Sequence, residues 1–237
     1  MQKMVKILVV QSRTRPERIE RERENFTRTI GDTAEVEFLS ALDEKLAWKS
    51  PEQFLRDSDG VILGGSSDFD FNGGREEKDP ARLVSFIILS RVKNFISYAL
   101  KEEMPLLGVC FGHQMIAEMN GGKVSNDKEQ TKFGSYEIAL TKEGMRDPLF
   151  SKLPPSFFAQ YSHKDSVTEL PKGSVLLADA PNCRFAALRY GKKAYTVQFH
   201  PEVERNSLEK GPHHDSPEAS RIVPLWIDLI VSGKKKG

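Results

Sequence analysis

Short apolar runs recur along the first half of the chain, and after each run apolar residues return with helical spacing. Nearly continuous apolar runs are typical of strands that are buried on both faces of a sheet. Gly or Pro residues mark several ends of the segments that have helical spacing. The predicted strands of this half are 5–10, 34–39, 60–63 and the run that begins at Pro105, and the predicted helices are 16–30, 51–56, 80–103 and 114–119.

The second half has a different pattern, in which short strand-like pieces are separated by Pro and Gly turns. Such pieces predict antiparallel hairpins, whereas the alternation of strands and helices in the first half predicts a parallel sheet with helices on both faces. The expected fold class is α/β, a doubly wound, mostly parallel sheet in three layers with added antiparallel hairpins. We find no linker or internal repeat, so a single domain over 1–237 is expected. The strand-like pieces are 135–140, 157–161, 174–178, 183–189 and 194–199, and a loop at 212–217 and a helix at 218–231 close the chain.

The predicted helix at 80–103 begins with Asp79 as its N-cap and with Pro80 at its first helical position. Its apolar arc is wider than a single buried stripe requires. Burial in the core is the main interpretation, and contact with another protein is the alternative. No apolar run approaches the roughly 20 residues of a membrane span, and the apolar run at the N-terminus is too short for a signal peptide.

Composition and charge argue against several classes of protein. Lys plus Arg number 35 and Asp plus Glu number 34, and the net charge of +1 gives no reason to expect nucleic acid or an anionic membrane as partner. The charged positions of the helix at 16–30 are interpreted as a solvated face. Two cysteines, Cys110 and Cys183, cannot build a disulfide framework. We expect a cytoplasmic protein without a cofactor, in which Cys183 lies in the core.

One motif combines a reactive side chain with the steric features of a tight turn. The apolar run from Pro105 ends in Gly108-Val109-Cys110-Phe111-Gly112, and a predicted helix follows at once. This is the pattern of a nucleophile elbow, a strand-to-helix turn that lifts a side chain above a sheet, with Cys in the place of Ser. The flanking glycines are needed because the turn leaves no room for a Cβ atom. Since a helix N-terminus favours a thiolate, Cys110 is the candidate nucleophile.

A second motif, Val197-Gln198-Phe199-His200-Pro201-Glu202, ends a predicted strand at the same edge of the sheet. Glu202 can turn back to one imidazole nitrogen of His200 and leave the other nitrogen free for a thiol. In this interpretation Cys110 is the nucleophile, His200 is its base and later the acid, and Glu202 orients the imidazole. The reaction is attack on a carbonyl group, with a thioester intermediate that water hydrolyses.

A third feature is the pair Gly64-Gly65, which directly follows the predicted strand 60–63. Two glycines at the end of a parallel strand let backbone amides face a ligand. The N–H groups of Phe111 and Gly65 are the candidate donors of an oxyanion hole. The polar loop 68–78 comes next and is expected to be mobile.

The Cys110 and His200-Pro201-Glu202 motifs together resemble those of the class I (triad) glutamine amidotransferases, above all free-standing relatives of the GMP synthetase glutaminase domain. The resemblance extends from about Val5 to Val231. It implies a flavodoxin-like fold and hydrolysis of the glutamine side-chain amide to glutamate and ammonia.

Two further segments fit this resemblance and imply where the substrate binds. Residues 161–167 are similar to a third block of the family, and the Gly64-Gly65 pair is similar to its oxyanion loop. The groups implied to hold the α-amino and carboxylate groups of glutamine are Gln114 and the backbone around Ser162, Lys164 and Asp165, and the residues implied to surround the amide carbonyl are Gly64, Gly65 and Phe111.

The sequence also departs from the family pattern. Ser66 stands where the family usually has Pro, and an enlarged acidic loop, 68–74, follows it, which leaves the size of the accepted substrate open. The sequence contains no Gly-x-x-x-x-Gly-Lys-Ser/Thr P-loop and no second catalytic domain. ATP-dependent use of the ammonia therefore requires a partner, a separate synthetase subunit.

Two other functions remain open at this stage. The same triad suits a stand-alone γ-glutamyl hydrolase or peptidase that acts on a γ-linked peptide or amine. A regulatory module with an oxidant-sensing cysteine is the other alternative, although a sensor needs neither His200 nor Glu202.

The remaining histidines are weaker candidates. His163 is an alternative base, but its surroundings in the sequence fit a substrate-side loop better. His213, His214 and Asp215 could suggest a metal site, yet three adjacent residues rarely converge on one ion. No metal site is therefore predicted.

Overall fold

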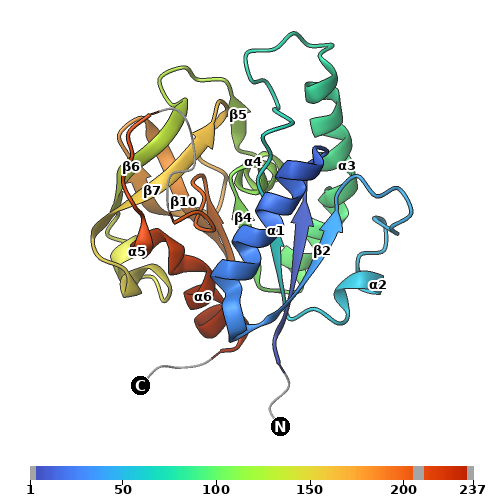
Figure 1. Ribbon diagram of the computed structural model, residues 1–237, viewed down its shortest axis with the longest axis horizontal. Coiled ribbons are helices and arrows are strands. Elements are labelled where there is room, and N and C mark those ends of the chain that lie inside the picture. The colour runs from blue at the N-terminus through green and yellow to red at the C-terminus, as the bar shows by residue number, and fades with distance from the viewer. Residues whose placement is uncertain (1–3, 205–210, 234–237) are drawn as a thin grey trace.

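One nine-stranded sheet forms the centre of the molecule (Figure 1). The computed structural model describes residues 4–204 and 211–233. The strand order is β2-β1-β3-β4-β11-β10-β9-β6-β7; the first five strands are parallel, and the pairs from β11 onward are antiparallel. The strands are β1 (Lys6–Gln11), β2 (Glu35–Ser40), β3 (Gly60–Leu63), β4 (Leu106–Val109), β6 (Lys132–Leu140), β7 (Ser156–His163), β9 (Ser174–Ala180), β10 (Cys183–Tyr190) and β11 (Ala194–Val197).

Helices cover both faces of the parallel half, which gives the doubly wound α/β fold that the sequence predicts (Figure 1). Two short strands, β5 (Lys123–Ser125) and β8 (Ser166–Glu169), form a separate antiparallel pair. The α-helices are α1 (Pro16–Ile30), α2 (Glu52–Leu55), α3 (Pro80–Lys101), α4 (Phe111–Met119), α5 (Pro217–Ser220) and α6 (Ile222–Trp226), and a π-helical segment (Ile227–Val231) follows α6. Three 3₁₀ turns lie at Gly31–Thr33, Gly144–Arg146 and Phe150–Lys152.

The alternation of side chains along β1 explains why its sequence is apolar throughout. Ile7 and Val9 pack with Phe26 of α1 on one face of the sheet. Leu8 and Val10 pack on the other face, in the cluster that contains Val92 of α3. A strand covered on both sides must be apolar at every position, so the nearly continuous run is the signature of this layer arrangement.

The carboxyl ends of β3, β4 and β11 lie together at one edge of the sheet, because these strands are parallel neighbours. The segments that follow them carry the Gly64-Gly65 pair, Cys110 and His200. Ligand sites of open parallel sheets form at this edge. The fold therefore brings the three sequence motifs to one place.

The structure corrects the prediction in the C-terminal region. The single helix expected at 218–231 is divided into α5, α6 and the π-helical segment. Pro224 lacks the N–H group that would bond to the carbonyl of Ser220, which interrupts a continuous α-helix at this point. The strand expected at 194–199 ends at Val197, and the three-residue strand β5 and its partner β8 were not predicted.

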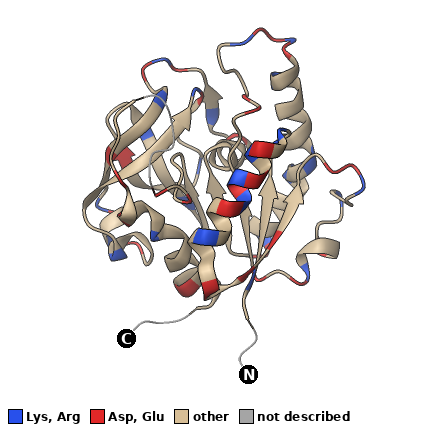
Figure 2. Cartoon of the chain, viewed as in Figure 1, with Lys and Arg blue, Asp and Glu red and all other residues tan. Residues whose placement is uncertain are grey.

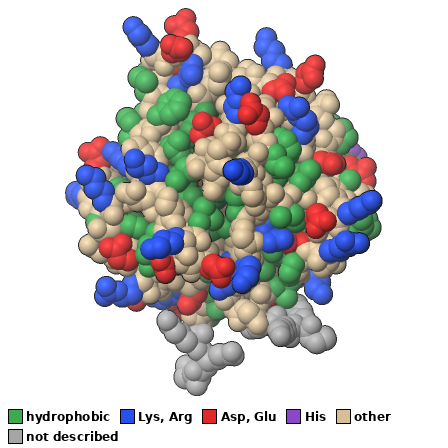
Figure 3. Space-filling model, turned by 180° about the vertical axis from the view of Figure 1, so that it is seen from behind, with side chains coloured by type: hydrophobic (Ala, Val, Ile, Leu, Met, Phe, Trp, Pro, Cys, Tyr) green, Lys and Arg blue, Asp and Glu red, His purple; other side chains and the backbone are tan. Residues whose placement is uncertain are grey.

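Helix α3 is long and apolar enough to cross a membrane, judged by length and composition alone. In the fold, Ile88, Val92, Phe95 and Ile96 of this helix are buried in the core. Its other side is exposed: Leu83, Phe86 and Ile87 are each about half accessible to solvent. Figure 3 shows the face of the molecule on which apolar side chains lie between charged ones. The wide apolar arc thus serves the core and an exposed surface together.

Candidate active site

Cys110 occupies the strained turn that the Gly-x-Cys-x-Gly motif predicts. Its φ of 50° and ψ of −98° lie in a region that residues with a side chain rarely adopt. A Cβ atom on Gly112 would lie 2.2 Å from the carbonyl oxygen of Leu63, and one on Gly108 would lie 2.8 Å from Cδ1 of Ile116. Both flanking glycines are therefore required by the space available, as expected from the sequence.

The Gly64-Gly65 corner packs directly against this elbow. The N–H of Gly112 donates to the carbonyl of Gly64 at 3.2 Å. A Cβ atom on Gly65 would lie 2.9 Å from Cε1 of His200 and 3.5 Å from Cβ of Cys110. The imidazole, the cysteine and the corner thus meet around a single point, at which even a methyl group has no room.

His200 and Glu202 form a buried pair beside the cysteine. Nδ1 of His200 lies 2.7 Å from Oε1 of Glu202, and the N–H of His200 donates to the carbonyl of Gln160. Burial by itself lowers the pKa of His200, but the charges of Glu202 and Cys110 outweigh it and raise this pKa well above 6.5. The imidazolium form of His200 is therefore favoured between the carboxylate and the sulfur.

Gln198 is a neighbour of Cys110 that the sequence interpretation missed. Its Nε2 lies 3.7 Å from Sγ of Cys110, and the carbonyl of Ser162 lies 3.9 Å from the same sulfur. An N–H directed at sulfur stabilises negative charge on it. The signal was present in the sequence, because Gln198 precedes His200 by two positions and shares its face of the extended segment.

The proposed oxyanion donors lie where the turn presents backbone N–H groups. Phe111 is the first residue of α4, and its N–H therefore has no carbonyl partner within that helix. Ser66, the residue that replaces the family's usual Pro, shapes the loop after Gly65. Its Oγ accepts the N–H groups of Asp68 at 3.2 Å and of Phe69 at 3.1 Å.

A small cavity of about 70 Å³ opens beside Cys110 and contains most of the residues implied to bind the substrate. Gln114, Ser162, Lys164 and Asp165 all line it; its other lining residues are Ser66, Ser67, Phe69, Asp70, Cys110, Phe133 and His163. The structure therefore brings these candidates together beside the nucleophile.

Two of these candidates already have partners within the protein. Nε2 of Gln114 donates to the carbonyl of Asp165 at 2.7 Å. The carboxylate of Asp165 accepts the N–H groups of Asn72 at 2.7 Å and Gly73 at 2.6 Å. Asp165 thus anchors the tip of the loop that follows the oxyanion corner, a role that the sequence did not predict.

The loop 68–78, which was expected to be mobile, has further anchors. Asp68 pairs with Arg18 at 2.6 Å. Burial raises the pKa of Asp68, but the hydrogen bond from the N–H of Thr14 and the charge of Arg18 outweigh this effect, so the pKa is lower than usual. Phe71 stacks on Phe111 with the ring centroids 5.1 Å apart. The loop therefore closes one side of the small cavity through both polar and apolar contacts.

Helix α1 has the predicted solvated face, with one exception, Glu22, which is buried in an ion pair with Arg13 just before the helix. The exposed charged residues are Glu17, Glu20, Arg21, Arg23, Glu24 and Arg28. Glu22 is 2% exposed, and its Oε1 lies 2.9 Å from Nη2 of Arg13. Burial raises the pKa of Glu22 even though Arg13 opposes the shift. Glu22 lies four residues before Phe26 and three after Ile19, so it shares their buried stripe. Figure 2 shows both signs of charge along α1.

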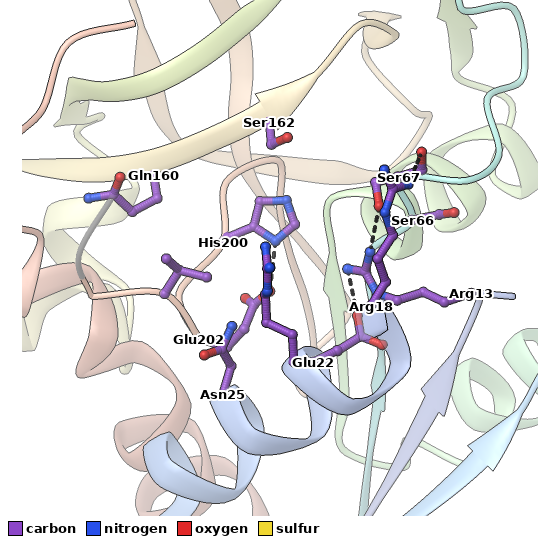
Figure 4. Close-up of a pocket in the computed structure, with 12 residues that line it drawn as sticks. Arg13, Arg18, Glu22, Asn25, Ser66, Ser67, Gln160, Ser162, His200 and Glu202 are labelled. Carbon is purple, nitrogen blue, oxygen red and sulfur yellow. Dashed lines mark hydrogen bonds and ion pairs between the residues drawn. The ribbon is translucent and has the colours of Figure 1, made fainter. Parts of the chain in front are cut away.

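A second and larger cavity, of about 240 Å³, lies on the other side of His200 (Figure 4). The two cavities share Ser66, Ser67 and Ser162 as lining residues. Cys110 lines the small cavity, whereas His200 and Glu202 line the large one. In Figure 4, α1 lies along one side of the large cavity and Gln160 and Ser162 lie on the other.

His163 lines the small cavity, but burial keeps it from carrying a charge there. Burial lowers the pKa of His163 to about 3, and its Nδ1 lies 3.0 Å from the carbonyl of Asp165. His214 stacks on Phe158. Among residues 4–204 and 211–233, no group of three or more His, Cys, Asp or Glu side chains is placed to hold a metal ion. Cys183 is buried in the core, as predicted.

A cysteine on a strand-to-helix elbow of an α/β fold, with a histidine–carboxylate pair at the same sheet edge, is an arrangement typical of enzymes that attack a carbonyl group. The family model of class-I glutamine amidotransferases matches residues 78–216, more than half of the chain. The chain therefore belongs to the class-I glutamine amidotransferase family.

Individual relatives agree with this family. The chain is 34% identical over 182 residues to a glutamine-hydrolyzing GMP synthase subunit of Methanothermobacter thermautotrophicus, and the match covers 76% of this chain and 80% of the relative. It is 38% identical over 135 residues to the subunit of the same name from Methanocaldococcus jannaschii, and this match covers 54% and 70%.

Solved structures show the same fold. A putative GMP synthase subunit from Thermoplasma acidophilum superposes with a TM-score of 0.72 at 20% identity, covering 98% of this chain and 97% of that one. A glutamine amidotransferase from Thermotoga maritima superposes with a TM-score of 0.61 at 25% identity, covering 85% and 78%.

Proposed function

We propose that this protein hydrolyses the side-chain amide of glutamine through a thioester at Cys110. The observation that carries the proposal is the position of Cys110, on a bend with positive φ and in electrostatic contact with an imidazole that Glu202 orients. The positive φ of Cys110 costs stability that a turn with glycine at this position would not cost, so the strain itself points to a functional role.

The proposed reaction has two steps. The Cys110 thiolate attacks the amide carbon, and the oxyanion forms beside the N–H groups of Gly65 and Phe111. His200 gives its proton to the leaving nitrogen as the C–N bond breaks, which releases ammonia and leaves a γ-glutamyl thioester. Water, deprotonated by His200, then attacks the thioester and releases glutamate.

The small cavity suits the amino-acid end of glutamine. Lys164 is the cation that lines it, and its Nζ lies 3.6 Å from the carboxylate of Asp70. A substrate carboxylate can bind Lys164 there, and the carbonyl groups around Ser162 and Asp165 can accept the α-ammonium group. Gln114 positions this segment through its bond to the Asp165 carbonyl.

We further propose that the ammonia passes to a separate synthetase subunit. The relatives named as GMP synthase subunits support a partner. The exposed residues Leu83, Phe86 and Ile87 of α3 offer an apolar surface for such a partner. Phe86 contacts Phe71, which stacks on Phe111 next to the nucleophile, so a contact on α3 would reach the active site through two ring contacts.

Turnover and labelling of the same cysteine test the proposal together. The wild type is expected to release glutamate from glutamine and to bind one equivalent of a glutamine-like diazoketone at Cys110. Cys110→Ala should lose at least about 10⁴-fold in kcat and remain unlabelled, because no other group can form the thioester. Circular dichroism of the folded variant is the control, and a normal glutaminase rate in Cys110→Ala would end the proposal.

The partner is tested separately. Affinity purification of the tagged protein should recover an ATP-using protein, and its addition should raise the rate of glutamine hydrolysis. The double variant Phe86→Ser and Ile87→Ser should weaken this recovery while Met145→Ser, which removes another exposed apolar side chain, should not.

A second candidate function is cleavage of larger γ-glutamyl compounds by the same triad. The specific observation in its favour is the large cavity on the imidazole side of the cysteine, because ammonia is about the size of a water molecule and needs far less space.

A further inference from the structure

The two cavities divide the site at the bond that is to be broken. Cys110 lines the small cavity together with the residues proposed to bind the amino-acid end of the substrate. His200, which must protonate the leaving nitrogen, lines the large cavity. The acyl part of a substrate therefore occupies the small cavity, and whatever is attached to the leaving nitrogen projects into the large one.

The size of the large cavity exceeds what an ammonia molecule needs. Its volume of about 240 Å³ is several times the roughly 30 Å³ that one water molecule occupies in the liquid. A leaving amine of the size of an amino acid or a dipeptide fits such a space. Space alone, however, does not select a chemical class.

The charges around the large cavity make that selection. Three arginines, Arg13, Arg18 and Arg21, line it. Arg13 pairs with Glu22 and Arg18 with Asp68. Arg21 makes no hydrogen bond or ion pair within the part of the chain that the structure describes, and it is exposed.

The acidic residues do not cancel this remaining positive charge. Glu22 is engaged by Arg13, and Glu202 is engaged by His200. With these ion pairs balanced, the Arg21 charge is left over at the wall of the cavity. The Nε of Arg13 is buried without a hydrogen-bond partner among the described residues, but so are Oε1 of Glu22 and Oε2 of Glu202, so these buried atoms do not select the sign of a ligand. The uncompensated charge of Arg21 at the wall is what favours an anionic ligand.

His200 and Arg13 are neighbours beside the Gly65 corner. The Cβ position of Gly65 lies 2.9 Å from Cε1 of His200 and 3.4 Å from Nη2 of Arg13. In an α-amino acid a single carbon separates the nitrogen from the carboxylate. With the nitrogen at His200, the carboxylate lies in the cavity that Arg13, Arg18 and Arg21 line.

We propose that the large cavity is a leaving-group subsite for amines that carry a carboxylate, so that the protein cleaves γ-glutamyl amino acids and γ-glutamyl peptides in addition to glutamine. This inference rests on the proposed thioester chemistry at Cys110. The γ-carbonyl forms the thioester with Cys110, His200 gives a proton to the leaving nitrogen, and the free amino acid departs through the large cavity. Water then releases glutamate, and the sum is γ-glutamyl amide plus water to glutamate plus amine.

Three substrates separate charge from size. Glutamine leaves the cavity empty, γ-glutamylmethylamide adds a neutral group, and γ-glutamylglycine adds a carboxylate. The wild type is expected to show a kcat/KM for γ-glutamylglycine about 5-fold or more above that for γ-glutamylmethylamide. This preference should decrease with added NaCl, because salt screens an exposed arginine.

One matched pair of variants tests the source of the preference. Arg21→Gln should abolish the 5-fold preference. It should lower kcat/KM for γ-glutamylglycine more than for glutamine or γ-glutamylmethylamide, whose leaving groups carry no carboxylate. Arg56→Gln removes the same charge just before β3, at the opposite edge of the sheet, and should preserve the preference. Equal values for the two γ-glutamyl amides in the wild type, or an unchanged preference in Arg21→Gln, overturns the subsite.

A binding measurement keeps this test independent of turnover. Calorimetry with the Cys110→Ala protein should show tighter binding of γ-glutamylglycine than of γ-glutamylmethylamide, and the double variant with Arg21→Gln should lose the difference. If Cys110→Ala still hydrolyses glutamine, the proposed function fails while binding continues to test the subsite. If glutamine is hydrolysed through Cys110 but no charge preference exists, the subsite fails and the proposed function stands.

Discussion

The two cavities beside Cys110 differ in how they are built. The small one is bordered by a loop whose backbone N–H groups, at Asn72 and Gly73, donate to the carboxylate of Asp165, one of its lining residues. Both cavities have ionisable side chains in their walls, but the three arginines, from the start of α1 and the segment before it, line only the large one. A carboxylate that accepts two N–H groups is held in one position, whereas long arginine side chains adapt to their ligand.

This difference indicates that the two sides of the scissile bond contribute differently to substrate specificity. The acyl side has a fixed geometry and suits one group, the γ-glutamyl group in our proposal. The amine side has volume and charge, and it suits a range of leaving groups. Variants at the junction should affect every substrate, and variants within one cavity should affect only the property that this cavity controls.

Gly65→Ala is expected to have the largest effect, because Gly65 lies at the junction. The added Cβ would lie 2.9 Å from Cε1 of His200, so the imidazole or the oxyanion corner must move. We expect kcat to decrease about 10²–10³-fold for glutamine and for γ-glutamyl amides alike. Steady-state kinetics with both substrates measure this. A loss confined to one substrate would contradict the position of Gly65 at the junction.

Glu202→Gln should have the next largest effect, a decrease of about 10²-fold in kcat. The amide keeps the shape of the side chain but removes the charge that raises the pKa of His200. The limb of the pH–rate profile that reports deprotonation of His200 should therefore move to lower pH. A loss as complete as that of Cys110→Ala would show that Glu202 does more than orient the imidazole.

Asp165→Asn should act on the small cavity and have a moderate effect. The carboxylate accepts two backbone N–H groups of the loop, and weaker acceptance should loosen the wall of the acyl side. We expect KM to rise about 10-fold for all γ-glutamyl substrates, with little change in kcat. Asp59→Asn, which weakens a single bond to the N–H of Lys6 near the start of β1, is the matched control. A change in preference between charged and neutral leaving groups would contradict the division into two sides.

The smallest expected effect is on stability. The pKa of His200 is raised in the folded protein, so its protonation stabilises the fold below pH 6.5, and this contribution is lost as the pH rises through the raised value. The free energy of unfolding of the wild type should exceed that of Glu202→Gln by about 1 kcal/mol at pH 6, and by less at alkaline pH. Urea unfolding at both pH values measures this difference, and a gap that widens with pH would contradict the assignment.

The parallel half of the fold could be predicted because each of its parts has a local cause. β3 and β4 are short apolar runs, α1 begins at Pro16 and ends at Gly31, and α3 begins at the Asp79 cap. The elbow was predictable for the same reason. The two glycines around Cys110 are required because a Cβ atom on either would clash with residues a few positions away or with the neighbouring strand.

The rest of the site depends on contacts that no local pattern reveals. Asp165 is 93 residues from Asn72, and nothing in the sequence near either residue indicates that they meet. The pair of Arg13 and Glu22 depends on how α1 is rotated over the sheet. The large cavity arises between α1 and the segment after β11, and its existence follows from tertiary packing alone.

The backbone conformation at Cys110 sets thermal stability against the proposed activity. Glycine adopts a φ of +50° freely, and a side chain there costs about 1–3 kcal/mol. Cys110→Gly should therefore be relieved of this strain and melt at a higher temperature, and under the mechanism proposed above it would lose turnover. Selection for thermal stability alone would favour such a variant, whereas selection for the product of the reaction would retain the cysteine.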